Sequence, residues 1–84
     1  MKANRIQQDN KVLRELLRYL RLTAGLRQED IAERLRVPQS VISKYESGER
    51  RLDILELRCL CALFGVTLQD FVSRLEAKLK ASQQ

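Results

Sequence analysis

The segment Gln28–Gly48, with the sequence QEDIAERLRVPQSVISKYESG, carries the most information about the fold of this 84-residue chain. Its apolar residues recur at helical spacing in two short blocks, and Pro38 stands between them at a position where a helix can begin. Gly48 ends the second block, as a glycine does after a helix. The segment therefore predicts two short helices joined by a tight turn.

The flanking sequence predicts three further helices, so that the fold is all-α with five helices. The expected ranges are about Asn10–Ala24, Gln28–Leu35, Pro38 to just before Gly48, a helix between Asp53 and Gly65, and one that opens at Thr67. Asp53 with Glu56 and Thr67 with Asp70 have the spacing of helix N-terminal caps, and Gly25 and Gly65 suit helix ends. The apolar stripes predict these core residues: Leu13, Leu16, Leu17, Leu20, Ile31, Ala32, Leu35, Ile42, Tyr45, Ile54, Leu57, Leu60, Cys61, Phe64, Leu68, Phe71, Val72, Leu75 and Leu79.

The length predicts a single domain with a modest core, because a chain this small buries only about 60% of the surface that it exposes when unfolded. We expect a basic N-terminal arm at residues 1–9. The domain itself is expected at residues 10–80, with a frayed tail at residues 81–84.

The charge is positive and unevenly distributed. The formal net charge is +5 and the sequence pI about 9.7, which favours a polyanionic partner. Residues 1–21 carry six cations and two carboxylates, a net charge of +4, whereas residues 27–51 carry six cations and five carboxylates, a net charge of +1. Any strong positive field must therefore arise from how the side chains are arranged in space.

Several classes of function find no support in the sequence. Cys59 and Cys61 are too close together to close a useful disulfide loop, and on a helix they point about 200° apart, so they cannot chelate a metal ion within one subunit. We expect them to be packing residues in a reducing cytoplasm. No apolar run is long enough to cross a membrane, and residues 1–10 contain no apolar core region like that of a signal peptide. With no histidine and no catalytic constellation, we expect neither an enzyme nor a cofactor or metal site.

The expected third helix has two contrasting faces. At about 100° per residue, Ile42 and Tyr45 fall on one side and hold the helix to the body. Four polar residues share the other side: Gln39, Ser40, Ser43 and Lys44. Glutamine can pair with adenine, lysine can donate to guanine, and serine suits either base, so this face fits a DNA major groove. A merely solvated polar face is the alternative.

Residues from about Leu17 to Phe71 resemble the Xre or Cro and phage-repressor type of helix-turn-helix regulators. The resemblance rests on Arg21, Ala24-Gly25-Leu26, Gln28, Ile31-Ala32, Leu35, Val37, Gln39-Ser40, Ile42-Ser43, Tyr45-Glu46, Gly48 and Phe64-Gly65-Val66. It implies a compact, lambda-repressor-like five-helix DNA-binding domain. It also implies that the third helix reads bases in double-stranded DNA.

The resemblance implies roles for individual residues as well. Gln39, Ser40, Ser43 and Lys44 match the base-facing positions, and Gln28 would bind a phosphate and buttress Gln39. Ser47, Arg50 and Arg51 match the loop that grips the DNA backbone. Arg21 and Glu46 match a buried or semi-buried ion pair between the first and third helices.

Two departures from the family pattern concern arginines. Arg27 stands where the family often has a serine cap, and since an arginine cannot accept a hydrogen bond, we expect it to reach a phosphate itself. Arg36 stands where the family has glycine in the turn. Either a strained left-handed arginine or an altered turn is expected there.

Two features could hold a homodimer. Leu55, Cys59 and Leu63 form a second apolar stripe on the fourth helix, and the fifth helix continues beyond the usual end of the domain through Leu75 and Leu79. The alternative for this extension is that it folds back onto the first helix, near Ile6. We favour a homodimer, with the stripe near its centre, that binds a palindromic operator.

The function predicted from the sequence is sequence-specific DNA binding by a cytoplasmic transcriptional regulator, a repressor rather than an activator. Prophage repressors, restriction–modification controllers and antitoxins are all compatible settings. A second hypothesis is a protein-interaction adaptor that uses the apolar stripe to hold a protein partner.

Overall fold

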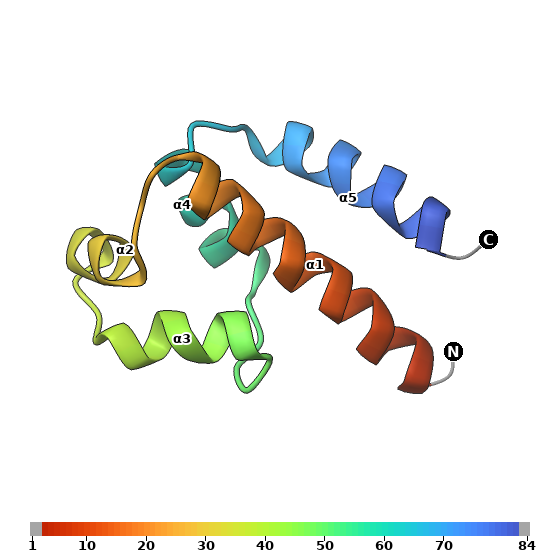
Figure 1. The fold of residues 1–84 in the computed structure, drawn as a ribbon, viewed down its shortest axis with the longest axis horizontal. Helices are drawn as coiled ribbons and strands as arrows, with labels where there is room; N and C mark the ends of the chain where they lie inside the picture. Colours follow the sequence, from red (N-terminus) through yellow and green to blue (C-terminus); the bar gives the residue numbers. More distant parts are fainter. Residues whose placement is uncertain (1–2, 83–84) are drawn as a thin grey trace.

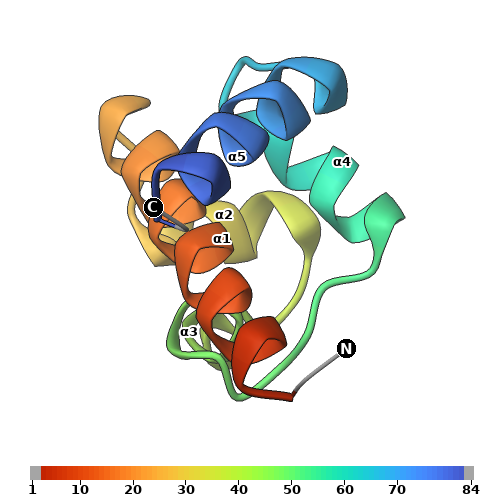
Figure 2. The same cartoon turned by 90° about the vertical axis from the view of Figure 1, so that its right-hand side faces the viewer.

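The computed structural model describes residues 3–82, with side chains described from Arg5 onward. These residues form five helices and no strand: α1 (Ala3–Thr23), α2 (Gln28–Leu35), α3 (Gln39–Ser47), α4 (Ile54–Leu63) and α5 (Leu68–Ser82). The predicted all-α, five-helix fold is confirmed. The two longest helices, α1 and α5, lie side by side (Figures 1 and 2), and α3 lies along the lower edge of the molecule in Figure 1.

The core lies where all five helices meet. Its buried apolar side chains are Leu16, Leu17, Leu20, Ile31, Ala32, Ile42, Tyr45, Leu57, Leu60, Cys61 and Phe71. Full burial of a large apolar side chain stabilises a fold by about 1.5–3 kcal/mol. In a domain with so few of them, each one contributes appreciably to stability.

Two residues that the apolar pattern placed in the core are exposed, so that prediction is wrong for them. Ile54 is 59% exposed and Val72 is 40% exposed. Ile54 is the first residue of α4, ahead of the turn that packs on the core, and Val72 lies at the edge of the buried stripe of α5. Helical spacing shows which residues share a face, but it does not show how much of that face the neighbouring helices cover.

The predicted caps set the helix ends. Asp53 accepts the N–H of Glu56 at 2.8 Å, and Glu56 accepts the N–H of Asp53 at 3.0 Å, which closes a reciprocal capping box on α4. Thr67 accepts the N–H of Asp70 at 3.0 Å before α5. Gly25, with a φ of 74°, follows α1 in the left-handed conformation. Pro38 precedes α3 as its cap residue, so the helix begins at Gln39, one residue later than expected.

The outer ends of α1 and α5 extend further than the sequence predicted. Residues 3–9, expected as an arm outside the first helix, are helical because they contain neither glycine nor proline and are mostly good helix formers. An ion pair between Arg5 and Asp9, at 3.9 Å, bridges one turn of this stretch. Ala81 and Ser82 belong to α5, whereas residues 1–2 and 83–84 of the expected arm and tail lie outside the described residues.

The described helices include none that could serve as a membrane span, since none of them combines the necessary length with the necessary apolar character. The two cysteines are free thiols, Cys61 buried in the core and Cys59 exposed. Burial raises the pKa of the Cys61 thiol, which keeps it neutral as a packing group. Within residues 5–82, the metal-ligating side chains form no group of three or more that could hold a metal ion.

Candidate nucleic-acid interface

The third helix, α3, has one exposed polar face, and its opposite face packs against the core. Gln39, Ser40, Ser43 and Lys44 are all exposed along α3. On the opposite side Ile42 and Tyr45 are only 3% and 5% exposed. Figure 1 shows α3 along the lower edge of the molecule, with α4, α5 and most of α1 above it. The four polar side chains can therefore meet a ligand while the helix stays anchored.

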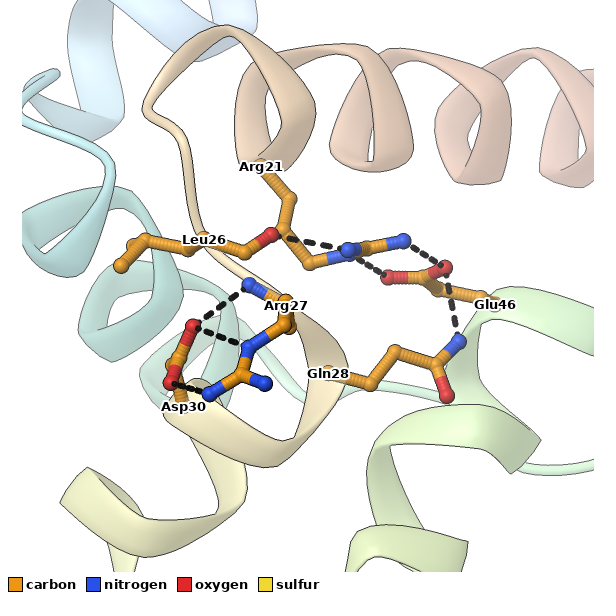
Figure 3. Close-up of polar contacts among 6 residues, drawn as sticks. All are labelled: Arg21, Leu26, Arg27, Gln28, Asp30 and Glu46. Atoms are coloured by element: carbon orange, nitrogen blue, oxygen red, sulfur yellow. Dashed lines mark hydrogen bonds and ion pairs between the residues drawn. The ribbon is translucent and has the colours of Figure 1, made fainter.

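A buried ion pair joins α1 to α3 (Figure 3). Arg21 Nε donates to Glu46 Oε2 at 2.6 Å, and Arg21 Nη2 donates to Oε1 at 3.0 Å. The third guanidinium nitrogen, Nη1, donates to the carbonyl oxygen of Leu26 at 2.9 Å. The two side chains are only 8% and 13% exposed. A two-pronged, charge-assisted contact of this kind fixes orientation as well as distance, so it sets how α3 lies against α1.

Gln28 joins the same cluster from the start of α2. Its Nε2 donates to Glu46 Oε1 at 3.0 Å (Figure 3). The sequence predicted that Gln28 would buttress Gln39, whereas the hydrogen bond found in the structure runs to Glu46 and ties α2 to α3. The backbone N–H of Gln28 lies in the first turn of α2, where an N–H has no intrahelical acceptor. It can therefore donate to an anion such as a phosphate.

Arg27, the N-cap residue of α2, is paired within the protein. Its backbone N–H donates to Asp30 Oδ2 at 2.8 Å, and its guanidinium contacts both carboxylate oxygens of Asp30, the closer at 3.2 Å (Figure 3). The Arg27 side chain and backbone N–H lower the pKa of Asp30. Because the Arg27 side chain is 70% exposed, a phosphate could still reach it, in competition with Asp30.

A second polar cluster, which the sequence reasoning missed, joins α3 to α4 and to the loop between them. The buried Tyr45 donates its hydroxyl hydrogen to Glu56 Oε2, and Arg50 Nη2 lies 3.5 Å from the same oxygen. The Arg50 guanidinium also stands over the Tyr45 ring, 5.2 Å from its centroid, a cation–π geometry. Glu56 had been predicted only as a capping partner and Arg50 only as a phosphate contact. No pattern in the sequence indicated that the Arg50 and Glu56 side chains lie close together.

The charges in this second cluster shift two pKa values in opposite directions. The N–H of Asp53 and the hydroxyl of Tyr45 lower the pKa of Glu56. Burial, together with the neighbouring Glu56 carboxylate, raises the pKa of Tyr45. At neutral pH, Tyr45 is therefore a neutral donor and Glu56 an ionised acceptor.

The loop after α3 is tied back to the helix that it leaves. The N–H of Arg50 donates to the carbonyl oxygen of Lys44 at 3.2 Å, and the hydroxyl of Ser47 donates to the same oxygen at 3.3 Å. The exposed Arg51 borders a groove between the outer ends of α1 and α5, beside Leu52 and Asp9. The two arginines of the loop thus have different surroundings, one paired with Glu56 and the other beside this groove.

Two alternatives were expected for the turn between α2 and α3, a strained left-handed arginine or an altered turn, and the structure has the first. Arg36 has φ 58° and ψ 46°, the left-handed conformation. Its N–H donates to the carbonyl oxygen of Glu33 at 3.3 Å, and the N–H of Val37 donates to that of Ala32 at 3.0 Å. These bonds satisfy the end of α2, although a left-handed arginine costs about 1–2 kcal/mol relative to its usual conformation.

The predicted dimer stripe on α4 is only partly accessible. Leu55 is 69% exposed and Cys59 is exposed, but Leu63 is half-buried and packs against the core. The extended end of α5 folds back along α1, which is the alternative to a dimer contact that the sequence allowed for this extension. Leu75 and Leu79 share the groove between the two helices with Ile6.

Comparison with known proteins agrees with this geometry. The sequence profile of the helix-turn-helix family matches residues 17–71. The chain belongs to the Xre-type helix-turn-helix family. A solved structure described as an XRE-family like protein from Pseudomonas syringae pv. tomato str. DC3000 is 39% identical and superposes with a TM-score of 0.80, covering 86% of this chain and 88% of that one. Membership of this family implies DNA binding in transcription regulation, and the family is not a class of enzymes.

A curated relative matches a shorter stretch. The HTH-type transcriptional activator BcrR of Enterococcus faecalis is 39% identical over 59 residues, which cover 70% of this chain and 29% of that protein. The chain thus spans less than a third of the length of this relative.

Proposed function

We propose that this protein binds a specific sequence of double-stranded DNA and reads the major groove with α3. The observation that carries the proposal is the exposed polar face of Gln39, Ser40, Ser43 and Lys44 on a helix whose other side is buried. Glutamine matches the donor and acceptor pair of adenine, and lysine matches the acceptors of guanine. A rigid helix that carries such side chains can discriminate between bases.

The grip on the DNA backbone would come from residues on both sides of that face. We assign phosphate contacts to Arg27, Gln28, Ser47, Arg50 and Arg51. The first-turn N–H of Gln28 supports this assignment because helix N-termini favour anions. Arg27 and Arg50 would exchange their carboxylate partners for phosphates when DNA binds.

The substitution Gln39→Ala tests base reading on a duplex selected from a random pool. We expect it to cost about 1–3 kcal/mol at the selected site and to leave affinity for random duplex nearly unchanged. Gln69→Ala, the same chemical change at an exposed position of α5, is the matched control. Arg51→Ala should weaken binding to both duplexes. An equal loss on both duplexes for Gln39→Ala would show that Gln39 does not read bases.

We further propose that the active species is a homodimer on a palindromic operator, held by the stripe of Leu55, Cys59 and Leu63. The exposed Leu55 supports the proposal because a large apolar side chain gains most from coverage. Sedimentation should find a dimer at micromolar concentration that Leu55→Glu dissociates. A wild-type monomer at high micromolar concentration would refute the homodimer, and a selected site without palindromic symmetry would argue against it.

We propose that the protein represses transcription, because a small domain blocks a promoter simply by occupying it. The BcrR relative is named an activator, so the sign needs a direct measurement. A reporter gene placed behind the selected site should lose expression when this protein is present. Increased expression would instead assign activation.

A protein-interaction adaptor is a second candidate, favoured by the adjacent exposed side chains of Ile54 and Leu55. The two functions differ in their response to salt. If the protein binds DNA through ionic contacts to phosphates, its affinity for random duplex should fall steeply as the salt concentration increases. An adaptor would show little binding to random duplex at any salt concentration.

A further inference from the structure

Arg14 makes contacts that neither the family resemblance nor the proposed base reading explains. It lies on α1 seven residues before Arg21, on the same helix face, and is half-buried. Its Nη1 donates to the backbone carbonyl oxygen of Glu46 at 3.3 Å. Its Nε is buried and has no hydrogen-bond partner among the described atoms. Burying a polar group without a partner costs stability, so the placement of this side chain calls for a reason.

The Arg14 guanidinium fills the space that a side chain at position 48 would occupy. A Cβ on Gly48 would lie 2.9 Å from Arg14 Cζ, 3.0 Å from Nη1 and 3.1 Å from Nε. Gly48 also has a φ of 87°, a conformation that disfavours any side chain. The backbone conformation therefore favours glycine here, and a side chain at position 48 would also displace the Arg14 guanidinium from its place.

Two arginines of α1 therefore hold the same residue of the recognition helix. Arg21 binds the carboxylate of Glu46, and Arg14 binds its backbone carbonyl. A cation at this end of α3 also complements the helix dipole and the last free carbonyls. Arg14 then contacts Gly48, where the chain leaves α3 for the loop that carries Arg50 and Arg51.

We propose that Arg14 is a positioning residue for DNA recognition, which fixes the end of α3 and the start of the following loop so that Gln39 and Lys44 meet the bases in register. The proposal rests on the proposed DNA binding. Arg14 acts through Glu46 and Gly48 and makes no phosphate contact of its own. The buried Nε is a cost of bringing the guanidinium against Gly48.

Binding measurements at several salt concentrations test this role. With folding checked by circular dichroism, Arg14→Ala should weaken binding to the selected duplex on the order of tenfold, as expected if about one base contact is misplaced. It should affect random duplex less, and the slope of affinity against salt should stay unchanged. Arg14→Lys should remain weak, because a lysine keeps the charge but lacks the planar guanidinium that lies against Gly48. Arg18→Ala, an exposed arginine on the same helix, is the control of equal charge.

Three results would overturn the proposal. Equal losses on both duplexes, with a slope smaller by about 0.9, would make Arg14 a phosphate contact. Wild-type affinity in folded Arg14→Ala would make it a residue of stability alone. Full recovery in Arg14→Lys would show that the charge suffices. If the wild-type protein bound no duplex, the proposed function itself would fail, whereas unaltered binding by Arg14→Ala would refute only the role of Arg14.

A double-mutant comparison tests the packing without DNA. Gly48→Ala should lower the unfolding midpoint of the wild-type protein more than that of Arg14→Ala, because only the backbone strain remains once the guanidinium is removed. An equal shift in both backgrounds would show that the guanidinium does not press on position 48, and would overturn the proposed contact.

Discussion

Two carboxylates hold α3 in place, and their surroundings differ. Glu46 on α3 binds Arg21 and Gln28 in a buried cluster, where the paired side chains are 8% and 13% exposed. Glu56 on α4 binds Tyr45 and Arg50 at the surface, where Arg50 is 50% exposed and Glu56 is 34% exposed. Both clusters attach α3 to a neighbouring helix, but only the second has an arginine that solvent or a phosphate can reach.

This difference in exposure gives the two clusters different properties. The buried cluster supports α3, whereas the arginine of the exposed cluster can change its binding partner. A buried ion pair that loses one member leaves the other as an uncompensated charge, so Arg21 cannot change partners without loss of stability. Arg50 pairs in a partly hydrated site, where an exposed ion pair contributes little. It can leave Glu56 for a phosphate at small cost. The first cluster therefore maintains the position of α3, and the second one can respond to DNA.

The largest effect is expected from breaking the buried cluster. Glu46→Ala leaves Arg21 buried without its carboxylate, and we expect it to lower the free energy of unfolding by about 3–5 kcal/mol. Urea denaturation measures this loss, with Glu49→Ala, an exposed glutamate in the following loop, as the control. Such a loss is a large part of the total stability of a small domain, about 5–15 kcal/mol.

Glu46→Gln keeps the measurement possible if the alanine variant does not fold. The glutamine preserves the shape and one acceptor for Arg21, so the loss should be smaller but still exceed that of Glu49→Ala. If Glu46→Gln and Glu49→Ala were equally stable, the buried pair would not be what holds α3 in place.

A smaller loss is expected at the surface cluster. Glu56→Gln removes the charge that binds Arg50 and weakens the capping contact to Asp53, so stability should fall by about 1 kcal/mol. Urea denaturation under the same conditions gives a direct comparison with Glu46→Gln. A loss as large as that of Glu46→Gln would remove the distinction between the two clusters.

The two clusters also differ in how well the sequence predicts them. The Arg21–Glu46 pair follows from the family resemblance, and the helix ends follow from local signals such as Asp53 and Gly25, which act within a few residues. The approach of Arg50 to Glu56, the contact of Arg14 with Gly48 and the exposure of Ile54 depend on how whole helices are rotated and packed against one another. Helical periodicity gives the face of each helix but not these orientations.

The pH dependence of stability should distinguish the surface cluster further. The pKa of Glu56 is lowered in the folded protein, so its contribution is present above the ordinary glutamate value of about 4.3 and is lost as the pH falls through the lower folded value. The stability difference between the wild-type protein and Glu56→Gln should therefore shrink from its neutral value toward zero below about pH 4.3. Denaturation curves from pH 7 to pH 3 test this. A difference that stayed constant to pH 3 would mean that the charge of Glu56 contributes nothing.

The smallest effect on stability, and the most informative for function, is expected from Arg50→Ala. Because Arg50 is half-exposed, loss of its ion pair with Glu56 and of its cation–π contact with Tyr45 should together cost only about 0.5–1 kcal/mol. If Arg50 exchanges Glu56 for a phosphate, the same substitution should weaken binding to selected and random duplexes alike and reduce the salt slope by about 0.9. Arg58→Ala, an exposed arginine of α4, should leave the slope unchanged. An unchanged slope in Arg50→Ala would instead mean that Arg50 stays on Glu56 and Tyr45 in the complex, so that both clusters serve only to hold α3.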